Sequence, residues 1–85
     1  MTNKAVQNII FEIGLIEQKY SETTWYELGI LCFIKDIANQ VLFKENGVNT
    51  ILESIDEEIG YLESSNRYTC EGLKEVKTLV QSYKA

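Results

Sequence analysis

Apolar residues recur every three or four positions in four segments of this 85-residue chain. This spacing is typical of amphipathic α-helices, because residues three and four apart share one face of a helix. Short polar stretches, which favour loops, separate the segments. The pattern predicts four helices, over residues 3–20, 24–45, 50–64 and 69–84.

Local signals mark several ends of these helices. Thr2 is the candidate N-cap of the first one. Asn46 and Gly47 tolerate the left-handed backbone conformation that commonly ends a helix. Thr50 and Glu53 then form a Thr-x-x-Glu capping box, in which the side chain of each residue accepts a hydrogen bond from the backbone N–H of the other. We therefore expect the second helix to stop at Asn46-Gly47 and the third to start at Thr50.

The fold class predicted from these elements is all-α, with residues 1–85 in a single helical domain. The chain has no proline and only five glycines, which argues against a sandwich or barrel with many tight turns. Four amphipathic helices with short loops most simply form a small antiparallel bundle, and a looser orthogonal packing of the same helices is the alternative. Gly14 and Gly29, inside predicted helices, are expected to allow close contact between helices.

Charge and composition exclude several classes of partner. Thirteen acidic and eight basic residues give a net charge of −5, which opposes binding to nucleic acid phosphates. The longest apolar stretch, residues 25–34, has about half the ~20 residues that span a bilayer. The first residues run into the helical pattern without a signal-peptide cleavage site. We expect a cytoplasmic protein that binds neither nucleic acid nor membrane directly.

The residues that most enzymes use are missing from the sequence. There is no histidine, the usual general base and the commonest metal ligand. Cys32 and Cys70 lie far apart, without the spacing of a zinc or redox motif, and Cys32 is expected to be a small buried apolar residue. The glycines are scattered singly, so no phosphate-binding loop is formed. The sequence predicts a protein without catalytic residues, metal or cofactor.

Acidic residues are concentrated in the third predicted helix, whereas the fourth carries Lys74, Lys77 and Lys84. The two helices should attract one another, although exposed ion pairs contribute only ~0 to 1 kcal/mol each. A divalent-cation site is one interpretation of the carboxylates, and a solvated acidic face is the better one. The candidate partner-binding residues on this face are Glu53, Asp56, Glu57, Tyr61 and Glu63.

The first two helices carry more apolar residues than one core-facing stripe requires. Phe11 and Leu15 fall on the polar side of the first helix. The second helix is apolar on two sides, which burial of Trp25 and Leu28 in a central helix would also explain. Its expected core face is Tyr26, Ile30, Phe33, Ile34, Ile37, Ala38 and Val41. The residues left over predict an apolar interface formed by Phe11, Leu15, Trp25, Leu28 and Cys32.

These features favour a non-catalytic protein that acts by binding another protein with an electropositive surface. Small acidic helical proteins that serve as inhibitors, immunity or antitoxin factors, or regulatory subunits are similar in size and charge, which is an analogy only. The alternative is a structural or assembly protein that forms a homodimer or oligomer through its first two helices. An enzyme or metal protein that uses only carboxylates is the third class, with less support than the first two.

Overall fold

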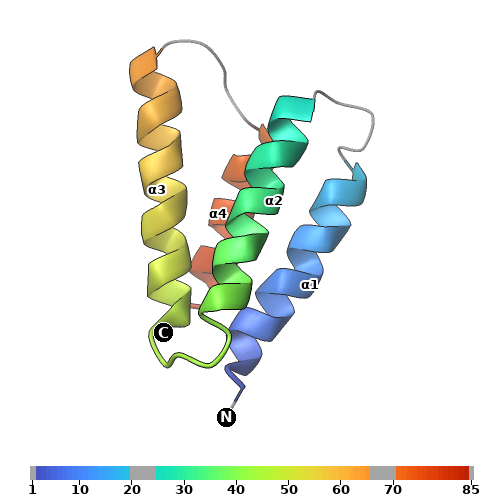
Figure 1. Ribbon diagram of the computed structural model, residues 1–85, viewed down its shortest axis with the longest axis vertical. Coiled ribbons are helices and arrows are strands. Elements are labelled where there is room, and N and C mark those ends of the chain that lie inside the picture. Colours follow the sequence, from blue (N-terminus) through green and yellow to red (C-terminus); the bar gives the residue numbers. More distant parts are fainter. Residues whose placement is uncertain (1, 20–24, 66–70, 85) are drawn as a thin grey trace.

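The computed structural model describes residues 2–19, 25–65 and 71–84, apart from the side chains of residues 25–27 and 65. Four α-helices follow one another, and these residues contain no strand: α1 (Lys4–Lys19), α2 (Trp25–Gln40), α3 (Gly47–Ser65) and α4 (Glu71–Ser82). Figure 1 shows α1 and α3 running in one direction and α2 and α4 in the other, with α4 behind α2 in this view. The predicted all-α antiparallel bundle is confirmed.

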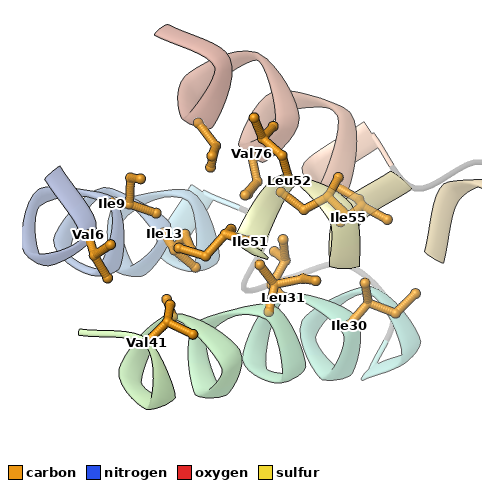
Figure 2. Packing of buried hydrophobic residues seen from close by; sticks show 14 of the residues in the cluster. Val6, Ile9, Ile13, Ile30, Leu31, Val41, Ile51, Leu52, Ile55 and Val76 are labelled. Atoms are coloured by element: carbon orange, nitrogen blue, oxygen red, sulfur yellow. The ribbon is translucent and has the colours of Figure 1, made fainter. Parts of the chain in front are cut away.

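All four helices contribute to one buried core. The apolar stripe of each helix turns inward, and side chains from the different helices converge between them (Figure 2). Each fully buried aliphatic side chain contributes about 1.5–3 kcal/mol by leaving water. The buried residues are Val6, Ile9, Ile13, Ile30, Leu31, Ile34, Ala38, Val41, Ile51, Leu52, Ile55, Leu62, Leu73, Val76 and Val80.

Where its side chains are described, which excludes Tyr26, the core face of α2 differs from the predicted one at two positions. Leu31 is fully buried, whereas Phe33 is 47 % exposed. The two residues are about 200° apart around a helix, so the stripe that buries Leu31 must turn Phe33 away. Ile30, Ile34 and Ala38 are buried as predicted.

The end of α2 and the start of α3 also differ from the prediction. The second helix ends at Gln40, five residues earlier than expected, and a turn covers residues 41–43. The third begins at Gly47, where the carbonyl of Asn46 accepts its first helical hydrogen bond from the N–H of Thr50 at 3.1 Å. The hydroxyl of Thr50 donates to the same carbonyl at 3.3 Å. Thr50 therefore lies inside α3, and its predicted capping role is wrong.

Gly47 is needed for a close approach of the chain rather than for ending a helix. A Cβ atom added there would lie 2.7 Å from Cγ2 of Val6 and 2.8 Å from the carbonyl oxygen of Val41. The start of α3 thus packs directly against α1 and the turn after α2. By contrast, an added Cβ at Gly14 or Gly29 would meet no atom within 4 Å, so the prediction that these glycines allow helix contact is wrong.

The N-cap of α1 is Asn3 and not Thr2. Its side-chain oxygen accepts a hydrogen bond from the N–H of Val6 at 3.3 Å, and its carbonyl accepts one from the N–H of Gln7 at 3.0 Å. Its own N–H donates to the carbonyl of Leu42 at 2.7 Å. The start of α1 is therefore tied to the turn that follows α2.

Candidate protein-binding surfaces

The outer face of α3 carries a line of exposed acidic side chains. Glu53, Glu57 and Tyr61 follow one another at four-residue intervals, so they lie on one side of the helix, and all three are exposed. Tyr61 is 66 % exposed, although tyrosine is on average partly buried in folded proteins. No lysine or arginine occurs between Gly47 and Ser65. We call Glu53, Glu57 and Tyr61 the acidic face.

Asp56 follows Glu53 by three residues and lines a pocket with it where α3 meets α4, whereas Glu63 lies further round the helix. Asp56 is about 60° and Glu63 about 80° from Glu53, and both are further from Glu57 and Tyr61. The carboxylate of Asp56 forms an ion pair with Nζ of Lys77 in α4 at 2.7 Å. This contact confirms the predicted attraction between the third and fourth helices. Glu63 is exposed. Of the predicted partner-binding carboxylates, Asp56 is thus engaged within the bundle.

The apolar side chains predicted to lie outside the core of α1 do so. Phe11 is 69 % exposed and Leu15 is 50 % exposed. They are four residues apart and share the side of α1 that faces away from Val6 and Ile13. Half or more of each residue is thus left open to solvent. Their role in an interface stays a prediction.

Leu15 also lines a groove of about 640 Å³ between α1 and α4. Both aliphatic and charged side chains line this groove. The sequence pattern did not indicate it, because it depends on which helices are neighbours. The lining residues are Glu12, Leu15, Ile16, Lys19, Glu71, Lys74, Glu75, Thr78 and Leu79.

Two of the other predicted interface residues, Leu28 and Cys32, lie on a different flank. Lys35 of α2 forms an ion pair with Glu17 of α1 at 2.6 Å, and Leu28 and Cys32 precede Lys35 on the same side of α2. Glu17 and Leu15 lie about 200° apart around α1, so the α2 flank and the α4 groove are nearly opposite. The fold therefore divides the predicted interface into two parts.

Burial differs between the members of that second part. Leu28 is half-buried. Cys32 is exposed and its thiol is free, so the prediction that it is buried is wrong. The backbone of Trp25 begins α2, but its side chain lies outside the described residues.

Polar contacts fix the position of α1 between its two neighbours. Lys19 pairs with Glu75 of α4 at 2.8 Å, and the hydroxyl of Tyr83 donates to Oε2 of Glu12 at 2.7 Å. This hydrogen bond, with a smaller contribution from burial, raises the pKa of Tyr83 above its usual range. On the other flank, the hydrogen bond to Glu17 raises the pKa of Lys35. Both shifts favour the protonated form of the donor in the folded protein.

Phe43 is an exposed aromatic residue that belongs to neither of the predicted surfaces. It lies in the turn after α2 and is 69 % exposed. Together with Phe11, Phe33 and Tyr61, it shows that exposed aromatic side chains occur on several sides of the bundle. Exposure alone therefore does not single out one binding surface, and the surrounding charges must be considered.

Within the described part of the chain, no group of three or more cysteine, aspartate or glutamate side chains is arranged to hold a metal ion. None of the four helices, as far as they are described, is long and apolar enough to cross a membrane. Comparisons with protein-family models, with curated protein sequences and with solved structures find no match to this chain.

Proposed function

We propose that this chain is a non-catalytic protein that acts by binding another protein, as an inhibitor, an immunity or antitoxin factor, or a regulatory subunit. Its partner would contact the acidic face of α3 and carry an electropositive surface. The observation that carries the proposal is the position of Tyr61, an exposed aromatic residue on the same line as Glu53 and Glu57.

Two physical arguments support this surface as a contact for a protein. Aromatic side chains are enriched among the residues that anchor interfaces, because they bury a large area with few rotatable bonds. Carboxylates around such an anchor raise the association rate with a positively charged partner and reject acidic ones. Glu53 and Glu57 can do this because α3 itself supplies no basic residue to neutralise them.

Asp56 has a separate role in this proposal. Its ion pair with Lys77 holds α3 against α4 and reduces the charge that it presents to a partner. We therefore expect substitutions of Glu53 and Glu57 to affect binding more than substitution of Asp56. Glu63 lies on the same side of α3 as Asp56 and would act at the rim of the contact.

Affinity capture from the native host tests the proposal. The wild-type chain is compared with the Glu53→Lys/Glu57→Lys variant, and captured proteins are quantified by mass spectrometry. The control is Asp36→Lys/Glu45→Lys, which makes the same change in net charge at two exposed positions outside α3. We expect one or a few basic proteins to be captured by the wild type and the control and lost with the α3 variant.

Two outcomes would contradict the proposal. If the α3 variant captures the same proteins in the same amounts as the wild type, the acidic face is not the contact surface. If the control loses them equally, net charge alone explains the capture. Circular dichroism of each variant checks that it remains helical.

A homodimer that acts in structure or assembly is the second candidate function. The exposure of Phe11 and Leu15 favours it, since an apolar pair of this kind is commonly covered in an oligomer. Leu28 and Cys32 of α2 lie beside α1 on its other flank. They would therefore join the same contact only if the second copy also covered the outer face of α1.

A further inference from the structure

One face of α1 has a charge pattern that is complementary to itself. Glu12, Leu15, Ile16 and Lys19 occupy positions i, i+3, i+4 and i+7, so they form a single stripe. All four line the groove between α1 and α4. The stripe has an acidic end, two aliphatic residues in the middle and a basic end.

A two-fold axis brings such a stripe against a reversed copy of itself. When two α1 helices pack antiparallel with Glu12 opposite Lys19 of the second copy, Leu15 lies opposite Ile16 of that copy. Both ends of the stripe then meet the opposite charge, and both aliphatic residues meet an aliphatic residue. We propose that this groove binds a second copy of the chain and that the protein forms an antiparallel α1–α1 homodimer.

The surroundings of the stripe extend the same contact. Phe11 lies one turn before Leu15 and is 69 % exposed, so it can cover the edge of the second copy. Leu79 of α4 adds aliphatic surface inside the groove. Burial of these side chains supplies the attraction, and the charged ends fix the register.

The contacts already made by the two charged residues are compatible with this arrangement. The hydroxyl of Tyr83 donates a hydrogen bond to Oε2 of Glu12, and Nζ of Lys19 pairs with Oε1 of Glu75. In the dimer, Lys19 of each copy would lie between Glu75 of its own chain and Glu12 of the other. Each end of the interface would thus hold two carboxylates around one ammonium group.

The acidic face of α3 cannot pair in this way. α3 contributes carboxylates and no basic residue to it, so two copies would bring like charges together there. Charge therefore assigns the two surfaces to different occupants, with a second copy in the groove of α1 and α4. The dimer does not depend on the acidic face binding any partner.

Charge reversal combined with mixing tests the dimer. In Glu12→Lys, two lysines face each other at both ends of the interface, and in Lys19→Glu, two glutamates do. Sedimentation equilibrium should show the Kd of each variant raised by about tenfold or more relative to wild type. An equimolar mixture of the two variants restores opposite charges at both ends, so it should form a heterodimer with nearly the wild-type Kd.

Glu53→Lys is the control, because it makes the same charge reversal on α3, and it should keep the wild-type Kd. Both groove variants lose an intramolecular contact, but that loss also persists in the mixture and cannot explain recovery there. A wild-type chain that is monomeric up to about 1 mM would overturn the proposal. So would Glu12→Lys and Lys19→Glu variants that are folded by circular dichroism and either dimerise as the wild type does or fail to associate when mixed.

Discussion

The side-chain nitrogen of Asn3 donates a hydrogen bond to the carbonyl oxygen of Lys44 at 2.8 Å. The same side chain caps α1 through its oxygen, and the backbone N–H of Asn3 binds the carbonyl of Leu42. One residue at the start of the chain thus satisfies a donor of α1 and two acceptors of the turn after α2. Gly47 follows that turn and packs against Val6. The end of the bundle is held by these local contacts.

Replacing Asn3 with alanine should lower the free energy of unfolding by about 1–2 kcal/mol, because both the cap and the bond to Lys44 are lost. Asn3→Asp keeps the capping oxygen but not the donor, so its loss should be smaller. Thr2→Ala is the neighbouring control and should have no measurable effect. Urea denaturation of the four proteins measures this order, and equal stability of wild type and Asn3→Ala would contradict the assignment of the cap.

Alanine at Gly47 should destabilise the fold by about 1–3 kcal/mol, because the added methyl group has no room between Val6 and the carbonyl of Val41. Alanine at Gly29 should instead stabilise it by about 0.5–1 kcal/mol, since that helical position has open space and alanine has the higher helix propensity. Thermal denaturation compares the two. Stabilisation by Gly47→Ala would show that the contact is not as close as described.

The free energy of unfolding should fall above about pH 10. The pKa of Tyr83 lies above its ordinary value of 10.0 in the folded protein, so its contribution is complete below pH 10 and is lost as the pH rises through the raised pKa. The raised pKa of Lys35 acts in the same direction, from its ordinary value of 10.5 upward.

Urea denaturation between about pH 8 and 11 measures this dependence. Tyr83→Phe should flatten part of the fall, because its ring cannot donate to Glu12. Tyr61→Phe makes the same change on the exposed side of α3 and should keep the wild-type profile. If Tyr83→Phe and the wild type gave parallel curves, the hydrogen bond to Glu12 would contribute nothing to stability.

The helices could be predicted wherever their signals are local. The stripe of Val6, Ile9 and Ile13 depends only on spacing along the chain, and α1 was predicted within one residue at each end. The end of α2 could not be predicted in this way. Its turn is fixed by hydrogen bonds to Asn3, which lies 41 residues before Lys44.

The candidate surfaces were predictable to different degrees for the same reason. The exposure of Phe11 and Leu15 follows from their position opposite the core stripe. The groove between α1 and α4 was not predicted, because Leu15 and Leu79 are brought together only by the packing of the first and last helices. An attraction between the third and fourth helices was predicted from their charges. The sequence did not indicate which residues pair, and the structure shows that they are Asp56 and Lys77.

Site-specific photo-cross-linking in the native host tests most directly whether the acidic face binds a partner. Tyr61 is replaced by a photoreactive phenylalanine analogue, and Phe43, an equally exposed aromatic residue on the turn after α2, is replaced in the control. We predict a single heavier adduct with a basic protein at position 61 and none at position 43. No adduct at position 61, or the same adduct at both positions, would contradict the proposed function.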